Sequence, residues 1–147
     1  MTKVIVFDMD GTIANLYGIS GWLDYLVACD PYPYKAATPL VNMNRLARRL
    51  NRLQADGWRI EVVSWLSKNS NAEYDKAVTS AKIEWLNHHL RSVRWDEIHI
   101  LPYGTPKHEV AGVAGGILFD DEERNRENWV GVAYDVNNIL EILEGLM

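Results

Sequence analysis

The stretch VIVFDMDGT, from Val4 to Thr12, decides how this chain is interpreted. Its four leading apolar residues predict a buried β-strand, and two carboxylates, Asp8 and Asp10, follow one residue apart. Side chains alternate along a strand, so both carboxylates share a direction if the extended geometry continues, and Gly11 permits a tight turn. Because adjacent carboxylates repel unless a cation or a proton lies between them, the pair indicates a hard divalent metal. A solvated aspartate turn at the end of a strand is the alternative.

Two more apolar stretches end in polar residues further along the chain. The stretch IEVV ends at Ser64, and GILF ends at Asp120 and Asp121. Between them, Lys107 lies in GTPKH, a turn that enters a helix-like segment. Helix capping by Ser64, and solvation of the lysine and of the acidic run, are the alternatives for each residue alone. Their order, and their positions at the ends of elements, favour a functional set.

This ordered set of motifs resembles the haloacid dehalogenase superfamily of phosphohydrolases. The resemblance extends from Val4 to about Asp121, most of the chain, and its most specific part is DMDGT after a hydrophobic strand. The turn is also similar to that of small deoxyribonucleotidase-like members. The resemblance implies a phosphatase that depends on Mg²⁺ and acts through an aspartyl-phosphate intermediate.

The resemblance also implies the catalytic and metal-binding residues. Asp8 corresponds to the nucleophile, and Asp10 corresponds to the general acid and base. Mg²⁺ is the implied cofactor, and it prefers oxygen ligands. Its expected ligands are the carboxylates of Asp8 and Asp120 and the backbone carbonyl of Asp10, and Asp121 would contribute directly or through a water.

The resemblance further implies that four positions bind phosphate. Their shared property is a hydroxyl, a backbone N–H or a positive charge at the end of an element, and they are Thr12, Ser64, Trp65 and Lys107. Trp65 would contribute its backbone N–H, whereas Lys107 would act as a point charge. The neighbouring His108 is the less favoured alternative to Lys107.

Strand and helix patterns alternate along the chain, which predicts an α/β fold with a doubly wound parallel sheet. The expected strands cover residues 3–7, 59–63, 97–101, 116–119 and 129–134. The expected helices cover residues 41–54, 71–90, 107–113 and 136–146. The helix at 41–54 is amphipathic, and its arginines are interpreted as a solvated face rather than a phosphate-binding one.

Residues 13–40 do not follow the alternation. They contain two glycines, a short apolar piece at 22–27 and the run DPYPY. In the resembled superfamily this position holds a flap or a cap over the active site, and the segment is too short for a full cap. We expect a single domain over residues 1–147 with a small lid of one helical turn and a loop; an ordinary surface loop with a packed Trp22 is the alternative.

Composition restricts the class of protein. The chain has 147 residues, enough for one domain with a real core, and a net charge of −5, which argues against a broad nucleic-acid-binding face. Its single cysteine, Cys29, cannot form an intramolecular disulfide. Neither a signal peptide nor an apolar run of roughly 20 residues is recognisable, so no membrane partner and a cytoplasmic location are expected.

Two other functions would use similar residues. A phospho-receiver signalling domain also combines acidic residues, a hydroxyl, a lysine and Mg²⁺, but its phosphoacceptor aspartate ends the third strand, where this chain has Leu101-Pro102-Tyr103. A non-catalytic phosphate- or metal-binding domain of the same fold would be expected to lack Asp8 or Asp10.

The substrate is the least determined part of the prediction. The chain has 6 Trp and 7 Tyr, with Trp65 beside Ser64 and with Trp22, Tyr32 and Tyr34 in the expected lid. Aromatic faces near a phosphate site could stack a nucleobase, so a small phosphate monoester such as a nucleotide is expected. Packing in the core is the alternative for Trp65.

Overall fold

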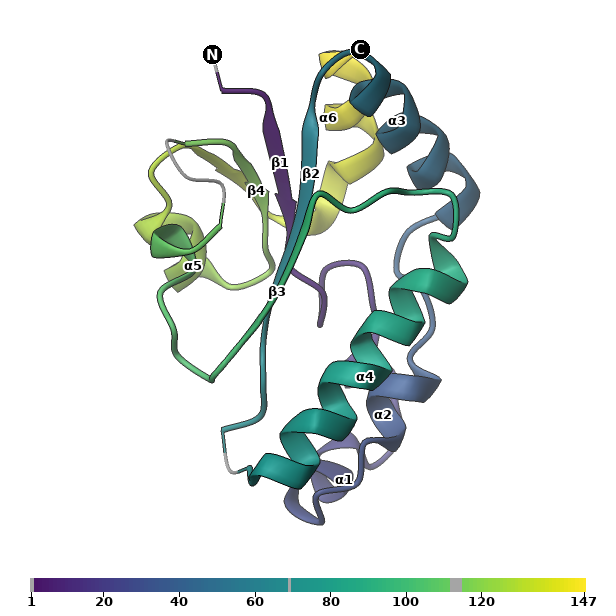
Figure 1. Cartoon of the computed structure of the whole chain (residues 1–147), viewed down its shortest axis with the longest axis vertical. Helices are drawn as coiled ribbons and strands as arrows, with labels where there is room; N and C mark the ends of the chain where they lie inside the picture. Colours follow the sequence, from purple (N-terminus) through teal and green to yellow (C-terminus); the bar gives the residue numbers. More distant parts are fainter. Residues whose placement is uncertain (1, 69, 112–114) are drawn as a thin grey trace.

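The computed structural model describes residues 2–68, 70–111 and 115–147, and it has a five-stranded parallel sheet at its centre (Figure 1). The strands are β1 Val4–Phe7, β2 Arg59–Trp65, β3 Glu97–Leu101, β4 Ile117–Phe119 and β5 Val132–Tyr134. Their order in the sheet is β3-β2-β1-β4-β5, and every neighbouring pair is parallel. The predicted α/β class with a doubly wound parallel sheet is confirmed.

Six α-helices and three short 3₁₀ helices connect the strands within the described residues. The α-helices are α1 Trp22–Val27, α2 Tyr32–Ala36, α3 Met43–Ala55, α4 Ala72–His89, α5 Glu123–Asn128 and α6 Ile139–Leu146. The 3₁₀ helices are η1 Leu16–Gly18, η2 Lys107–Glu109 and η3 Val136–Asn138. The two longest helices start at asparagine caps: the side chain of Asn42 accepts from the Arg45 N–H, and that of Asn71 accepts from the Tyr74 N–H.

The two faces of the sheet are covered unequally. On one face, Ile5 and Phe7 of β1 pack in the main core with apolar residues of α3, α4 and α6. On the other face, Val4 and Val6 pack in a smaller cluster that includes Trp129. All four residues of β1 are buried, as expected for a central parallel strand that reads as one apolar run.

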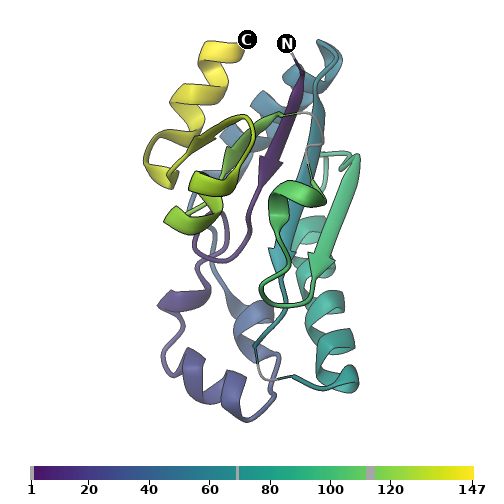
Figure 2. The ribbon, with the colours of Figure 1, turned by 90° about the vertical axis from the view of Figure 1, so that its left-hand side faces the viewer.

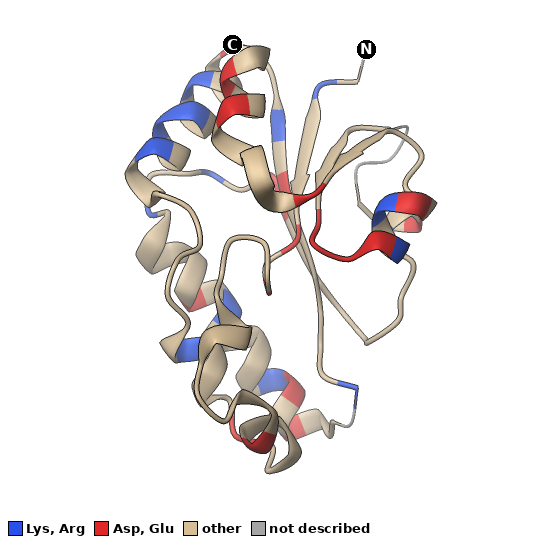
Figure 3. Ribbon diagram, turned by 180° about the vertical axis from the view of Figure 1, so that it is seen from behind, with Lys and Arg blue, Asp and Glu red and all other residues tan. Residues whose placement is uncertain are grey.

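The basic residues of α3 lie away from the strand ends that carry the acidic residues (Figure 3). Arg49 pairs with Glu144 of α6, with 2.8 Å between its Nη2 and a carboxylate oxygen. The arginines at 45, 48 and 52 are exposed. This arrangement agrees with a solvated helix face rather than with a phosphate-binding one.

The segment between β1 and α3 lies at the end of the molecule opposite the two termini (Figure 2). It contains η1, α1 and α2, which is more helix than the expected single helical turn and loop. Within the proline-rich run, Pro33 lies in the first turn of α2, where proline is tolerated. Tyr34 of α2 is buried against α4 in a cluster with Tyr74 and Val78, and this packing stabilises a helix that local sequence would not.

Two other predicted elements differ from the structure. The fifth strand begins at Val132 rather than at Trp129, because the Trp129 indole packs inward and donates to the backbone carbonyl of Gly116 at 2.9 Å. The helix expected at 107–113 is a 3₁₀ helix over Lys107–Glu109, and residues 112–114 lie outside the described residues. No helix of the described chain is long and apolar enough to cross a membrane.

Candidate active site

Three carboxylates meet at the carboxyl ends of β1 and β4, which are neighbours in the sheet. Asp8 follows β1, and Asp120 and Asp121 follow β4. One carboxylate oxygen from each of these three residues lies within 4.8 Å of the others. Strand β1 has β2 on one side and β4 on the other, and the following strands are added outwards from these two. The cluster therefore lies between β1 and β4, where the strand order reverses direction. Ligand sites of open α/β sheets form at such a position.

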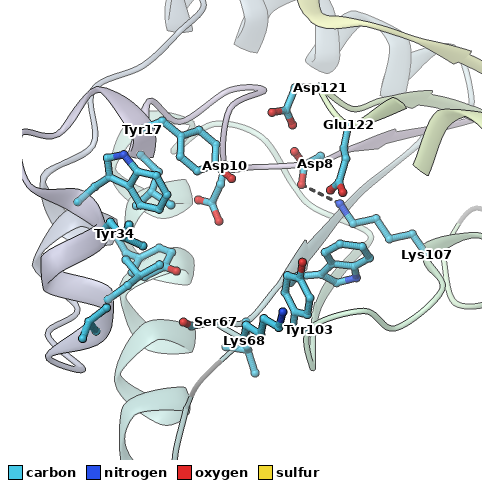
Figure 4. Close-up of a pocket in the computed structure, with 17 residues that line it drawn as sticks. Asp8, Asp10, Tyr17, Tyr34, Ser67, Lys68, Tyr103, Lys107, Asp121 and Glu122 are labelled. Atoms are coloured by element: carbon cyan, nitrogen blue, oxygen red, sulfur yellow. Dashed lines mark hydrogen bonds and ion pairs between the residues drawn. The ribbon is translucent and has the colours of Figure 1, made fainter. Parts of the chain in front are cut away.

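Lys107 bridges two of these carboxylates. Its Nζ lies 2.8 Å from Asp8 Oδ1 (Figure 4). The same atom lies 2.8 Å from Asp120 Oδ2, and the lysine side chain is only 4% exposed. Burial alone would lower the pKa of Lys107, but the charges of Asp8 and Asp120 outweigh burial and raise it. The lysine therefore stays charged beside the expected nucleophile, and the structure brings Lys107 rather than His108 to the acidic cluster.

The turn after β1 orients the Asp8 carboxylate. The Thr12 hydroxyl is buried and donates to Asp8 Oδ2 at 2.8 Å. Gly11 has a φ of +82°, and a Cβ at this position would overlap the Asp121 carboxylate, so the turn requires glycine. Thr12 binds the expected nucleophile in this structure, and its role as a phosphate ligand stays a prediction.

The acidic cluster carries more negative charge than the single lysine offsets. Burial, followed by the charge of Asp8, raises the pKa of Asp120 to about 6 and that of Asp121 to about 8. A hard divalent cation would relieve this repulsion, and the three carboxylates offer it oxygen ligands within reach of one ion. The residues present therefore fit Mg²⁺.

The second carboxylate of the motif, Asp10, has a partner that the sequence did not suggest. Lys82 of α4 is 1% exposed, and its Nζ lies 3.0 Å from Asp10 Oδ2. The same ammonium donates to Ser64 Oγ at 2.6 Å and to the backbone carbonyl of Trp65 at 2.7 Å. Burial raises the pKa of Asp10 although the charge of Lys82 opposes that shift.

A sequence signal for Lys82 existed. It lies four residues after Val78 and four before Leu86, and all three are buried on one stripe of α4. A lysine in an apolar stripe is almost never fully buried unless it is paired, so this position deserved a search for an acidic partner.

Ser64 and Trp65 lie at the end of β2, as expected, but their side chains have other partners. Ser64 is fully buried, and its hydroxyl accepts from Lys82. The Trp65 indole N–H donates to the backbone carbonyl of Thr105 at 2.8 Å, and the Lys107 Nζ lies 5.0 Å from the centroid of its ring. Phosphate binding by these two residues stays a prediction.

A cavity of about 600 Å³ opens above the acidic residues (Figure 4). Asp8, Asp10, Asp121 and Lys107 form its charged floor. Its walls are mostly aromatic and aliphatic, and their apolar residues are Leu16, Tyr17, Trp22, Leu23, Leu26, Val27, Tyr34, Trp65, Leu66 and Tyr103. Within the described residues, Thr12 and Ser64 lie behind this floor rather than on its surface.

Comparison with known proteins identifies the fold. No family model and no curated protein matches the chain. A solved structure of D,D-heptose 1,7-bisphosphate phosphatase from B. bronchiseptica, complexed with magnesium and phosphate, is similar over 99% of this chain and 98% of that chain, with a TM-score of 0.62 and 13% identity. The corresponding phosphatase from Burkholderia thailandensis matches over the same shares, with a TM-score of 0.57 and 12% identity. The chain has the haloacid-dehalogenase-type fold that its motifs predicted.

Proposed function

We propose that this protein is a Mg²⁺-dependent phosphohydrolase that forms an aspartyl-phosphate on Asp8. The observation that supports this most directly is the setting of the Asp8 carboxylate. It is buried at the end of the central strand, with Lys107 on one oxygen and Thr12 on the other. Asp120 and Asp121 lie close enough to Asp8 for the three carboxylates to bind one metal ion. Such a carboxylate is held in one orientation and faces a cavity large enough for a small phosphate ester.

The reaction would proceed in two displacements on the same residues. In the first, an Asp8 oxygen forms a bond to phosphorus while the bond from phosphorus to the leaving oxygen breaks, and Asp10 gives its proton to that oxygen. In the second, Asp10 takes a proton from water, the water oxygen bonds to phosphorus, and the Asp8 carboxylate leaves. Lys107 neutralises part of the negative charge that otherwise keeps a phosphate away from Asp8.

Asp8, Asp120, Asp121 and the backbone carbonyl of Asp10 would hold the Mg²⁺. When bound, the ion supplies Lewis-acid stabilisation of charge on the phosphoryl oxygens and orients them. The magnesium and phosphate in the B. bronchiseptica phosphatase support this choice of ion. Asp121 would bind the ion directly or through a water.

The test is hydrolysis of p-nitrophenyl phosphate by the purified protein over a Mg²⁺ titration, with chemical trapping of the phosphorylated enzyme. We expect turnover that disappears in excess chelator, and a trapped phosphate that maps to Asp8. Turnover that persists in chelator would exclude the metal assignment. A phosphorylated protein without turnover would instead indicate a receiver-like domain, and metal binding without either would indicate a non-catalytic one.

We propose further that the substrate is a small phosphate monoester with a planar aromatic group, such as a nucleoside monophosphate. The support is the wall of the cavity, where Tyr17 and Trp22 are in edge contact at 4.9 Å between ring centroids and Tyr103 is 49% exposed. The two similar phosphatases are described as acting on a heptose bisphosphate, a sugar with many hydroxyls. An apolar, aromatic wall offers few partners to such hydroxyls and offers stacking to a base.

Three further predictions from the sequence belong to the same proposal. Residues 1–147 would form one domain, with residues 13–40 as its lid, and the protein would work in the cytoplasm as a soluble enzyme. A panel of nucleotides, sugar phosphates and phosphorylated polynucleotide ends, assayed with Mg²⁺, tests the substrate class. We expect the highest kcat/KM for a nucleoside monophosphate, and a preference for sugar phosphates would contradict this.

A further inference from the structure

We propose that Lys82 is a positioning residue for the reaction, because it holds the Asp10 carboxyl group at the point where protons are exchanged. This inference rests on the proposed function. The lysine comes from α4, whereas Asp10 follows β1 and Ser64 ends β2. One ammonium group thus joins three segments at the edge of the cavity, with contacts of 3.0 Å to Asp10 Oδ2 and 2.6 Å to Ser64 Oγ.

The environment of Lys82 fixes the position of its ammonium group. The group has three N–H donors, and three acceptors surround it: Asp10 Oδ2, Ser64 Oγ and the backbone carbonyl of Trp65. The ring of Tyr34 lies 5.0 Å away, measured from Nζ to the ring centroid. Because all three donors are used in a site that is 1% exposed, the ammonium cannot move without leaving a buried polar group unpaired.

A purely structural role would not require this charge. The neighbouring buried positions on the same stripe of α4 are Val78 and Leu86, and an aliphatic side chain would continue that stripe without any polar partner. The lysine instead carries a charge towards Asp10, a carboxylate on the floor of the cavity, whereas Lys107 pairs with Asp8 and Asp120.

Two lysines therefore separate the two carboxylates of the motif. Lys107 holds Asp8 at 2.8 Å, and Lys82 holds Asp10 at 3.0 Å. Although the carboxylates are only two residues apart in the sequence, each is bound to a cation from a different element. Each carboxylate of the motif thus has its own lysine at hydrogen-bond distance, so that one carboxylate can attack phosphorus while the other serves the leaving oxygen.

The positioning role predicts a dependence on the leaving group. As the bond from Asp8 to phosphorus forms and the bond to the leaving oxygen breaks, a basic alkoxide must receive the Asp10 proton. A nitrophenolate is stable enough to leave without it. Misplacing Asp10 should therefore slow the first displacement for an alkyl phosphate and hardly affect it for a nitrophenyl phosphate.

The experiment compares Lys82→Met with the wild-type protein on benzyl phosphate and p-nitrophenyl phosphate. Rapid quenching with excess enzyme measures the release of the leaving alcohol in one turnover. We expect the rate for benzyl phosphate to fall by about 10²-fold, at the lower end of what general acid catalysis contributes. The rate for p-nitrophenyl phosphate should change by less than about threefold, because its first displacement needs little proton transfer. Asp10→Asn should show the same selectivity, and Lys82→Met should add little to it in the double variant.

The matched control is Lys76→Met, the same substitution at an exposed position of α4, which should alter neither rate. Lys82→Arg provides a second variant that keeps the charge but changes the reach, in case Lys82→Met does not fold. It should also lose rate selectively on benzyl phosphate. Equal losses on the two substrates, or none, in the folded variants would overturn the positioning role. A wild-type protein that releases neither alcohol would overturn the proposed function instead.

Discussion

The floor of the cavity is charged, whereas its walls are mostly apolar. The floor consists of carboxylates that follow β1 and β4 and of Lys107 in η2, and Asp8 and Lys107 are buried there. The outer wall is α1, a helix without a buried residue, where Leu23 is 57% and Val27 is 76% exposed. The reacting groups are thus held by the most tightly packed part of the molecule, and the groups that would meet the rest of a substrate are held by its periphery.

This difference separates two questions about function. Strand ends in a packed sheet can fix a reaction geometry, whereas short helices in a connection can change in sequence without loss of the fold. The floor therefore supports the proposed reaction class, phosphoryl transfer, and the proposed lid would select which ester enters. The similarity to two heptose bisphosphate phosphatases, at 12–13% identity, bears on the fold and leaves the lid to be interpreted from its own residues.

The largest expected effect comes from Asp8→Asn, which breaks the floor at its nucleophile. We expect turnover to fall by on the order of 10⁴-fold or more, because an amide cannot replace the attacking carboxylate. The side chain keeps its size and an oxygen that can accept from Thr12, so the far-ultraviolet circular dichroism spectrum should be unchanged. Near-native turnover by this variant would refute the covalent mechanism.

Asp10→Asn should have the second largest effect. Loss of general acid–base catalysis is expected to lower kcat by about 10²–10⁴-fold on an alkyl phosphate. The phosphorylated Asp8 should accumulate when the substrate is p-nitrophenyl phosphate, because its hydrolysis needs the same group as a base. Acid-quenched samples would reveal the trapped phosphate. A variant that shows no such accumulation and keeps its turnover would remove Asp10 from the reaction.

Metal binding by the floor should appear as a stability change that depends on pH. The pKa of Asp120 is raised to about 6 and that of Asp121 to about 8, by burial and then by the charge of Asp8. An aspartate in the unfolded chain has a pKa of about 3.9, so between about pH 4 and pH 8 the folded protein holds more protons than the unfolded chain. The contribution of these groups to the free energy of unfolding therefore falls as pH rises through this range.

Thermal unfolding with and without Mg²⁺ measures this contribution. The metal-free protein should lose stability between pH 5.5 and pH 8.5, and Mg²⁺ should raise its Tm more at the higher pH, where the carboxylates are ionised. At 100 times its Kd the ion would add about 2.7 kcal/mol. Asp120→Ala should raise the Mg²⁺ concentration needed for both Tm and activity, and an unchanged requirement would contradict its role as a ligand.

Most of the floor could be predicted because its residues are tied to local patterns. A short apolar run gives a buried strand, and DMDGT and the Asp120 pair are adjacent to such runs in the sequence. The apolar stripe of α4 could have marked Lys82 as paired, but its partners could not be predicted, because they depend on the reach of a side chain from the middle of α4 to two strand ends.

Helix α5 and the two helices of the proposed lid could not be predicted from local sequence. The sequence of α5, ERNREN, has no apolar periodicity, so nothing marked it as a helix. It follows the acidic pair and is tied to it by Asn125, whose side chain donates to Asp120 Oδ2 at 3.2 Å. The two lid helices are short and depend on packing against α4 rather than on helix propensity.

The smallest effects should come from the walls, and two tryptophans distinguish stacking from support. Trp22 lies in α1 beside Tyr17 and lines the cavity, so it is free to meet a base. Stacking and packing were both open for Trp65, which also lines the cavity; Lys107 and Arg124 lie 5.0 Å and 5.2 Å from its ring centroid, and its N–H is bound to Thr105. Trp65 therefore supports the floor.

Replacing each tryptophan by alanine should accordingly change different quantities. Stacking on an aromatic side chain is worth about 1–3 kcal/mol per base, so Trp22→Ala should lower kcat/KM for a nucleoside monophosphate by about tenfold or more. It should leave p-nitrophenyl phosphate nearly unaffected, because a small ester does not reach the wall. Trp65→Ala should lower both activities by similar factors, since the position of Lys107 serves every phosphate. If Trp65→Ala affected only the nucleotide, the indole would be a base-stacking residue after all, and the division between floor and wall would have to be drawn elsewhere.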